Sequence, residues 1–298
     1  MNEFQGPMQP YPGMERWARR VKLPVSGMEL YLYDTGGLSK PPVLLLHGLG
    51  DEADTWHHVV PLLEKNYRVL APDLPGFGRS DQGKRAYTIP FFVHTLLELL
   101  DALAIPRVVL AGHSTGAIIA HATALEHPQR VERLILIGGS LVSQENHLDP
   151  GLLLFLLPLI GEWSYNRLRK DPQAAYRTLE GYYNRLDELP QADRDFLYQR
   201  VNERVWSDGQ RRGFLSTLRN LVAWLPAQQK NLPERLRGWS GPTLVVWGEH
   251  DRINAVANAH ALVRLVPAAR LVIVPGAGHN VQQEQAGAVV EAIKGLQV

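Results

Sequence analysis

The feature that most constrains this chain is a serine held between two glycines, in the segment Gly112-His113-Ser114-Thr115-Gly116. It follows the apolar run Val108–Ala111 and precedes Ala117–Ala120, whose small apolar residues favour a helix. A Gly-x-Ser-x-Gly sequence between a strand and a helix is typical of a sharp turn that presents the serine hydroxyl. The glycines are needed because such a strained turn is too crowded for bulky side chains. The pattern predicts a strand, a turn and a helix, with Ser114 as the candidate nucleophile.

The elements predicted before residue 142 alternate between strands and helices. An apparent hairpin comes first, and later strands are short apolar runs of the kind that is covered on both faces. The predicted strands are 20–25, 28–34, 43–46, 67–71, 108–111 and 133–137, and the predicted helices are 55–65, 89–103 and 117–126. This alternation predicts the α/β class, with a doubly wound, mostly parallel sheet.

The alternation stops between residues 143 and 236, where helical patterns occur with almost no strand signal. The candidate helices there are 152–160, 174–186, 191–205 and 213–224, and beyond them lie strands 243–247 and 270–274 with helices 255–266 and 281–296. We therefore expect a helical cap, 143–236, inserted into a core domain formed by 20–142 and 237–298. We interpret residues 1–19, which are rich in Pro, Gly and Met, as an N-terminal extension whose composition is compatible with disorder.

Composition excludes several classes of function. The formal net charge is +1 and no long basic block is present, so the chain lacks the electrostatic signature of a nucleic-acid-binding protein. There is no cysteine, which removes disulfides, thiolate zinc sites and cysteine nucleophiles. No apolar run reaches the length of a transmembrane helix. We expect a cytoplasmic protein that needs no cofactor and does not insert stably into membranes, while its oligomeric state stays open.

Two further residues could activate the serine. A serine hydroxyl is a poor nucleophile near neutral pH, so it needs a base, and the base needs an acid that orients it. Asp251 lies four residues past the strand predicted to end at Trp247, and His279 lies five residues past the strand predicted to end at Val274. The carboxyl ends of parallel strands share one sheet edge, where ligands of such sheets bind. Ser114, Asp251 and His279 are therefore expected to meet there.

At this point the chain resembles the α/β-hydrolase fold superfamily over almost its whole length. Beyond the serine turn, the resemblance rests on segments that follow the strands: His47-Gly48-Leu49-Gly50, Asp73-Leu74-Pro75-Gly76-Phe77-Gly78-Arg79-Ser80, Gly248-Glu249-His250-Asp251 and Gly276-Ala277-Gly278-His279. The chain order Ser, Asp, His is also the order associated with this fold.

The resemblance implies a role for each site residue. Ser114 would attack an acyl carbonyl, His279 would shuttle the proton, and Asp251 would hold the imidazole and stabilise its charged form. The oxyanion would be held by two backbone N–H groups, those of Thr115 and of Leu49. Each donor is worth roughly 3 kcal/mol of the barrier.

Structural interpretations compete with these roles. Ser114 and Asp251 could simply cap helices, His279 could be a structural histidine, and Glu249 is a rival acid that lies closer to its strand. We favour the catalytic interpretation because Ser114, Asp251 and His279 each follow a predicted strand, where catalytic residues of such a sheet are expected. The glycine-containing loop 73–81 is interpreted as a structural turn, since its glycines do not precede a helix as a phosphate-binding loop requires.

Other histidines are expected to be structural. We expect His47 to brace the oxyanion loop and His113 to serve through shape or hydrogen bonding. His57 and His58, together with Asp54, could suggest a metal site, but no fourth ligand is visible in the sequence. We therefore expect no metal.

The predicted cap contains the run 152–160, which is apolar on every side and therefore either buried or in contact with an apolar ligand. The simpler interpretation is a helix that packs on the core domain. The functional one is a pocket wall, and it predicts that the substrate contacts Leu49, His113, Leu153, Leu156 and Trp163. Either way we expect an apolar group on the substrate.

These observations predict a serine hydrolase that cleaves carboxylic esters through an acyl-enzyme, with a small-molecule ester as its partner. Epoxide hydrolases and haloalkane dehalogenases resemble this chain but need Asp at position 114. Carbon–carbon hydrolases keep the same triad, yet here the turn continues as Gly-Ala and Asn280 follows the histidine, where an aromatic residue is common. A carbon–carbon or lactone hydrolase remains the alternative, as does a ligand receptor with little turnover.

Overall fold

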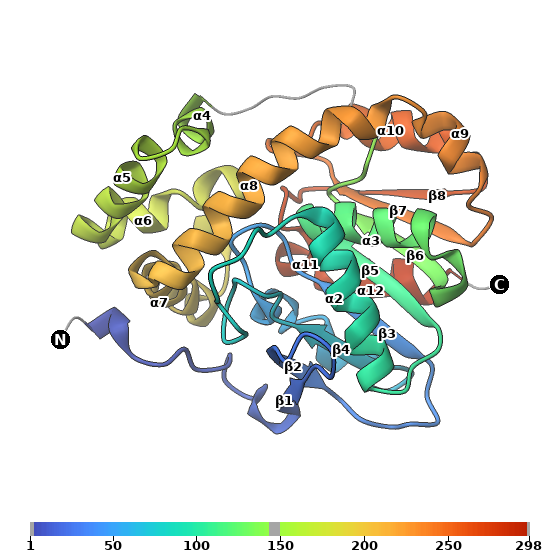
Figure 1. The fold of residues 1–298 in the computed structure, drawn as a ribbon, viewed down its shortest axis with the longest axis horizontal. Coiled ribbons are helices and arrows are strands. Elements are labelled where there is room, and N and C mark those ends of the chain that lie inside the picture. The colour runs from blue at the N-terminus through green and yellow to red at the C-terminus, as the bar shows by residue number, and fades with distance from the viewer. Residues whose placement is uncertain (1–2, 143–149, 297–298) are drawn as a thin grey trace.

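The computed structural model describes residues 3–142 and 150–296 and contains one eight-stranded sheet in the order β1-β2-β4-β3-β5-β6-β7-β8 (Figure 1). The strands are β1 (Ala18–Lys22), β2 (Glu29–Asp34), β3 (Pro42–Leu46), β4 (Arg68–Pro72), β5 (Val108–His113), β6 (Val131–Ile137), β7 (Thr243–Gly248) and β8 (Arg270–Val274). The hairpin β1–β2 joins the sheet antiparallel to β4, and all later pairs are parallel. The predicted α/β class and mostly parallel sheet are confirmed.

The apolar strands are buried because helices cover both faces of the sheet. Alternate residues of β3 point to opposite sides, so Leu44 and Leu46 join one apolar layer and Val43 and Leu45 the other. The first layer is covered by α2 (Ile89–Ala102), α3 (Thr115–Glu126), α9 (Leu232–Arg237) and α10 (Val256–Leu265). The second is covered by α1 (Val60–Leu63), α11 (Val281–Glu284) and α12 (Ala286–Lys294).

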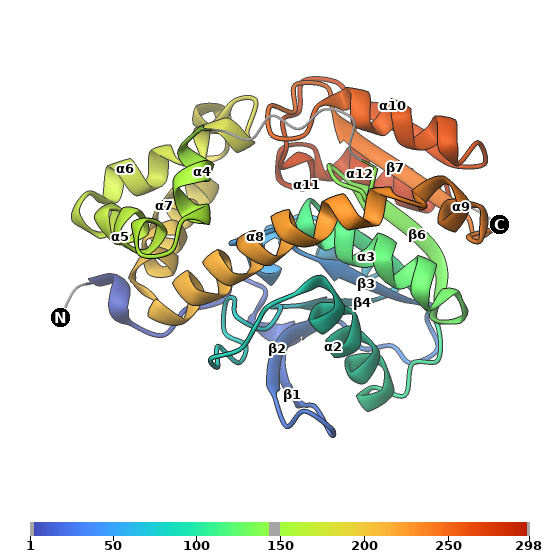
Figure 2. The ribbon, with the colours of Figure 1, turned by 45° about the horizontal axis from the view of Figure 1, so that its top comes forward.

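The block between β6 and β7 is helical in its described part, as predicted. It contains α4 (Pro150–Leu156), α5 (Ile160–Arg167), α6 (Pro172–Arg177), α7 (Gln191–Trp206) and α8 (Asp208–Gln229) before α9. Figure 2 shows α8 running from this group of helices across to the core, where it contacts α2. The domain boundary expected at residue 143 lies outside the described residues, and the interpretation of the block as a cap stays a prediction.

Four predicted helices differ from the structure. The segment 152–160 is helical only to Leu156, where α4 ends, and α5 begins at Ile160. The segment 55–65 forms a 3₁₀ turn, Ala53–Trp56, followed by the short α1. The segment 174–186 keeps only α6 and continues in 3₁₀ turns, which fits the low helix propensity of Gly181 inside it. The final helix is interrupted at Gln285, which separates α11 from α12. In these segments, periodic apolar spacing did not reveal breaks in the helix.

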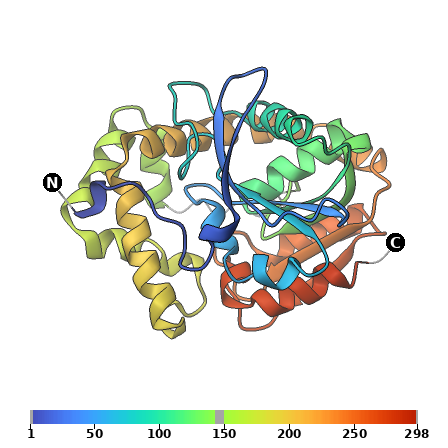
Figure 3. The ribbon, with the colours of Figure 1, turned by 90° about the horizontal axis from the view of Figure 1, so that it is seen from below.

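In the described part of the N-terminal extension, residues 3–19, large apolar side chains pack against the rest of the protein, although the composition is compatible with disorder. Phe4, Met14 and Trp17 are buried, and the ring of Phe4 meets Tyr198 of α7 edge to face. Figure 3 shows the segment running beside α7 before it reaches β1. Burial of large apolar side chains outweighs the cost of ordering a Pro- and Gly-rich segment.

No helix in residues 3–142 and 150–296 combines the length and the apolar character needed to cross a bilayer.

One buried histidine makes stability depend on pH. His121 lies on α3 inside the first apolar layer, and its Nδ1 accepts a hydrogen bond from the backbone N–H of Leu141. Burial, and to a smaller extent the positive charge of Arg235, together lower the pKa of His121 from its ordinary 6.5 to about 3. The folded chain therefore keeps this ring neutral at pH values where the unfolded chain protonates it.

We expect the free energy of unfolding to fall as the pH drops from about 6.5 towards 3, because only the unfolded chain gains this proton. His121 should contribute up to about 1.4 kcal/mol per pH unit to that slope. The variant His121→Gln, which can still accept the hydrogen bond, should show a shallower slope in urea denaturation at pH 7, 5.5 and 4.5. Parallel slopes for the two proteins would contradict the assignment.

Candidate active site

The predicted turn at Ser114 is present at the carboxyl end of β5. Ser114 has φ 54° and ψ −118°, a strained conformation for a residue with a side chain, and its N–H donates to the carbonyl of Ile137 at 2.9 Å. A Cβ atom at Gly112 would lie 2.2 Å from the carbonyl oxygen of Gly116, and one at Gly116 would lie 2.5 Å from that of His47. The turn therefore needs glycine at both positions.

The histidine and the aspartate predicted to accompany Ser114 form a buried pair. His279 Nδ1 lies 2.8 Å from Asp251 Oδ2, and both side chains are buried. The other oxygen, Oδ1, accepts from the backbone N–H groups of Ile253 and Asn254, at 2.9 and 2.8 Å. A carboxylate with three donors is an acceptor in the ionised form, so the ring proton sits on Nδ1.

This pairing leaves Nε2 of His279 with a free lone pair. The atom is buried and has no hydrogen-bond partner within the described part of the chain. His279 and Ser114 line the same cavity. A buried acceptor without a partner costs free energy, and its position on a residue that lines the same cavity as Ser114 suits a general base.

His113 holds the loop that carries His279. Its Nε2 lies 2.9 Å from the backbone carbonyl of His279, which can only accept, so Nε2 carries the proton. Burial, and then the neighbouring ring of His279, keep the pKa of His113 well below its usual range. A neutral ring that fixes the adjacent loop agrees with the structural role expected for His113.

The loop after β3 brings Leu49 next to the serine. Leu49 and Ser114 line the same cavities, and Thr115, as the first residue of α3, has a backbone N–H without an acceptor one turn earlier in the helix. His47 braces this loop as expected, because its Nε2 accepts from the N–H of Leu74 and its Nδ1 donates to the carbonyl of Gly48, both at 2.8 Å. The oxyanion role of Leu49 and Thr115 stays a prediction.

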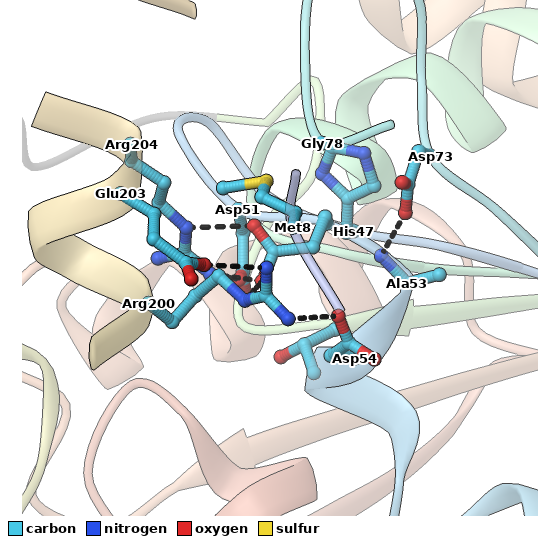
Figure 4. A network of polar contacts seen from close by, with 12 residues as sticks. Met8, His47, Asp51, Ala53, Asp54, Asp73, Gly78, Arg200, Glu203 and Arg204 are labelled. Atoms are coloured by element: carbon cyan, nitrogen blue, oxygen red, sulfur yellow. Dashed lines mark hydrogen bonds and ion pairs between the residues drawn. The ribbon is translucent and has the colours of Figure 1, made fainter. Parts of the chain in front are cut away.

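An ion network that sequence reasoning missed joins this loop to α7. Figure 4 shows Arg204 and Arg200 on α7 directed at Asp51 and Asp54 of the loop. Arg204 Nη2 lies 2.5 Å from Asp51 Oδ1, and its Nε lies 2.7 Å from Oε2 of Glu52. The network is buried, and Arg200 extends it by contacts of 3.1 Å with Asp54 and 3.3 Å with Glu52.

Arginine keeps the buried Glu52 ionised. Burial by itself would raise its pKa, but the guanidinium groups of Arg204 and Arg200 outweigh burial and hold the pKa below its usual range. Arg204 and Glu52 are 152 residues apart, so no local spacing could reveal the pair. The only available signal was that Arg200 and Arg204, four residues apart, share one face of a helix.

Two cavities meet at Ser114. One, of about 170 Å³, is lined by aromatic side chains that include Phe155, Tyr165 and Phe214. The other, of about 460 Å³, is lined chiefly by aliphatic side chains of α8, with Ile118 opposite. Its lining residues from α8 are Leu218, Leu221, Val222, Leu225, Pro226 and Gln229. The serine therefore lies between two apolar compartments.

The structure places only part of the predicted pocket next to Ser114. Leu49 and His113 line a cavity next to Ser114, but Leu153, Leu156 and Trp163 line neither. Helix α4 turns Leu152 and Phe155 inward, which leaves Leu153 45% exposed, and Trp163 is 59% exposed beside the guanidinium of Arg167. An apolar run that is hydrophobic all round does not reveal which face of its helix points to the pocket.

Comparisons with known proteins show the family to which the chain belongs. A family model described as the alpha/beta hydrolase fold matches residues 41–286. The chain is 31% identical over 271 residues to a 2-hydroxy-6-oxononadienedioate/2-hydroxy-6-oxononatrienedioate hydrolase of Klebsiella pneumoniae, covering 87% of each.

Solved structures give the same answer for the fold. The protein Cfl2 from Burkholderia cenocepacia superposes with a TM-score of 0.80 at 25% identity, covering 97% of this chain and 99% of that chain. A 2-hydroxy-6-oxo-6-phenylhexa-2,4-dienoate hydrolase from Rhodococcus sp. strain RHA1 superposes with a TM-score of 0.78 at 23% identity, covering 94% and 97%.

The ion network makes a test of coupling possible. Arg204→Met should lower the free energy of unfolding by about 3–5 kcal/mol, because it leaves Glu52 buried without its main partner. Arg204→Met combined with Glu52→Gln should recover part of that loss, since both charges are then removed. Urea denaturation measures both, and Arg185→Met, whose ion pair with Glu188 is exposed, is the control that should change little. Additive losses in the double variant would contradict the coupling.

Proposed function

The chain belongs to the α/β-hydrolase fold family, and we propose that it is a serine hydrolase that cleaves carboxylic esters with an apolar acyl or aryl group. The observation that carries the proposal is the unpartnered Nε2 of His279 in the cavity that Ser114 also lines. Asp251 supports it by fixing the ring proton on Nδ1, 2.8 Å away. A serine, a free imidazole lone pair and a buried carboxylate are the components of nucleophilic acyl transfer.

The proposed reaction has two steps. Ser114 Oγ attacks the ester carbonyl while Nε2 of His279 takes its proton, and the N–H groups of Leu49 and Thr115 hold the developing oxyanion. The tetrahedral intermediate collapses, and His279 returns the proton to the leaving alcohol. Water, deprotonated by His279, then attacks the acyl-enzyme, and the bond between the acyl carbon and Ser114 Oγ breaks as His279 returns the proton to Oγ, which releases the carboxylic acid. Asp251 stabilises the imidazolium in both steps.

The lining of the cavities supports an apolar substrate. Each methylene group that moves from water into an apolar cavity contributes about 0.8 kcal/mol, so the aliphatic compartment beneath α8 favours an extended alkyl chain. The aromatic compartment suits a compact or aryl group on the other side of the ester. Residues between 152 and 229, on α4, α5, α7, α8 and the segments that join them, supply more than half of these walls, so we propose that the block 143–236 is a cap that selects the substrate.

Carbon–carbon bond hydrolysis is the second candidate, and the comparisons favour it. The hydrolase of Klebsiella pneumoniae acts, by its name, on dienedioates, which carry two carboxylates. Among the described residues that line the two cavities, Arg204 is the only lysine or arginine, and its charge is already paired with Asp51 and Glu52. A dianionic substrate would therefore lack an available cation, which favours the ester.

Replacing the nucleophile tests the proposal directly. Ser114→Ala should lower kcat for p-nitrophenyl esters by more than about 10³-fold and abolish both the burst of p-nitrophenol and labelling by a fluorophosphonate probe. Ser39→Ala, at an exposed serine, is the matched control and should behave as wild type.

Other outcomes separate the alternatives. Wild type that neither turns over nor is labelled would overturn the enzymatic proposal, and tight ligand binding without turnover would favour a receptor. Faster cleavage of a 2-hydroxy-6-oxodienoate than of any ester in the series would favour the carbon–carbon hydrolase.

Chain-length preference tests the aliphatic compartment. Val222→Trp should lower the ratio of kcat/KM for p-nitrophenyl decanoate to that for the butyrate by about tenfold, because losing space for two methylene groups costs roughly 1.6 kcal/mol. Ala223→Trp places the same side chain at the next, exposed position of α8 and should leave the ratio unchanged. Equal ratios in Val222→Trp and wild type would place the alkyl chain elsewhere.

A further inference from the structure

Away from the active site, three side chains with metal-ligating atoms meet where the segment before α1 contacts α7. His57 Nε2 lies 3.2 Å from Asp193 Oδ1, and His58 Nε2 lies 2.8 Å from Asp193 Oδ2. The ligand atoms of the three residues all lie within 4.8 Å of one another. His57 and Asp193 are buried, while His58 is half-exposed.

The hydrogen bonds of His57 leave its Nε2 without a proton in the neutral ring. Its Nδ1 lies 2.7 Å from the backbone carbonyl of Asp54, and a carbonyl can only accept. The lone pair of Nε2 therefore faces a carboxylate oxygen of Asp193 at 3.2 Å. Two acceptors at that distance repel each other unless a metal ion or a second proton on the ring lies between them.

The surroundings resemble the outer shell of a metal site. Metal-binding histidines donate their second N–H to a carbonyl or carboxylate, as His57 does to Asp54. Ligating carboxylates are in turn hydrogen-bonded, and Asp193 Oδ1 accepts from the hydroxyl of Tyr11 at 2.7 Å. The ring of Tyr11 also stacks on that of His57, with 3.9 Å between centroids, which holds the imidazole in place.

We propose that His57, His58 and Asp193 bind one divalent transition-metal ion, with zinc as the best match. Zinc binds imidazole nitrogen and carboxylate oxygen at about 2.0–2.2 Å, which places tetrahedral ligand atoms roughly 3.3 Å apart. The three ligand atoms lie within 4.8 Å of one another, and the histidines lie 3.2 and 2.8 Å from different oxygens of Asp193, so the carboxylate would turn to offer one oxygen to the ion. A surface cavity lined by all three residues, and also by Glu188 and Glu284, leaves room for a water molecule as the fourth ligand.

The third ligand differs from the one that the sequence suggested. Asp54 follows the spacing of a local cluster, but its carboxylate binds the Tyr33 hydroxyl and the Arg200 guanidinium, while only its backbone reaches His57. Asp193 comes from the first turn of α7, 135 residues from His58. The ion would therefore tie α7 to the core.

The proposed site is structural rather than catalytic. None of its three ligands lines either cavity that contains Ser114. Its role would be to hold α7, whose arginines contact the loop after β3, and this role can be tested without any assay of hydrolysis.

The test uses the full chain, stripped with a chelator and titrated with zinc chloride against a chromophoric zinc indicator. We expect one zinc ion per chain, a rise in the thermal midpoint, and visible bands of tetrahedral cobalt when cobalt(II) replaces zinc. Asp193→Asn and His58→Gln should each weaken zinc binding by at least about tenfold, and Tyr11→Phe, which keeps all three ligands, by about 10–100-fold. His260→Gln, at an exposed histidine of α10, is the control that should bind like wild type.

Two results would overturn the proposal. If wild type binds neither zinc nor cobalt, a proton on His57 is enough to bridge the two acceptors. If Asp193→Asn and His58→Gln bind zinc as wild type does, the ion lies elsewhere. Circular dichroism checks that each variant folds. If Asp193→Asn does not fold, His58→Gln tests the site, because His58 is half-exposed.

Discussion

The close approach of three backbone segments at the carboxyl edge of the sheet determines the rest of the site. The turn at Ser114 presses against the end of β3, where a Cβ atom on Gly116 would lie 2.5 Å from the carbonyl oxygen of His47, and it hydrogen-bonds to the end of β6. Glycine is the only residue that permits this contact. Because the turn cannot shift, the hydroxyl of Ser114, the loop with Leu49 and the loop with His279 are held around one cavity.

The same edge concentrates buried charge. Glu52 and Asp54 lie under α7 and are balanced by Arg200 and Arg204. Removing such groups from water costs several kcal/mol per ion, so the network adds less to stability than its short contacts suggest. The network instead specifies where α7 lies on the core. In any other position of α7 the buried carboxylates would lose their partners and carry the full desolvation cost. That constraint positions the loop that carries Leu49.

Sequence patterns predicted what is local and missed what is assembled across the chain. The strands, the turn at Ser114 and the partners Asp251 and His279 were predictable, since each depends on a few neighbouring residues at a strand end. Arg204 and Asp193 were not, because their partners lie in the loops after β3 and no spacing rule connects them. The orientation of α4 was missed for another reason. A run that is apolar on all sides has no polar face to mark the exposed side of the helix, so packing alone decides which leucines face the pocket.

These contacts divide the helices above the site by role. Helix α7 is fixed to the core by ion pairs from Arg200 and Arg204 and by the contacts of Asp193. Helix α4 leaves Leu153 and Leu154 exposed and is tied to α8, where Arg219 donates to the backbone carbonyl of Phe155 at 3.0 Å. Helix α8 is held to the core by neutral hydrogen bonds of Gln210, Ser216 and Gln229, and it lines the aliphatic cavity with apolar side chains. Apolar contacts are non-directional, so substitutions on α4 and α8 can reshape the pocket without moving the loop that α7 holds. Because α7 itself contributes Val201 and Val205 to the aromatic cavity, this independence applies to the aliphatic compartment that α8 lines.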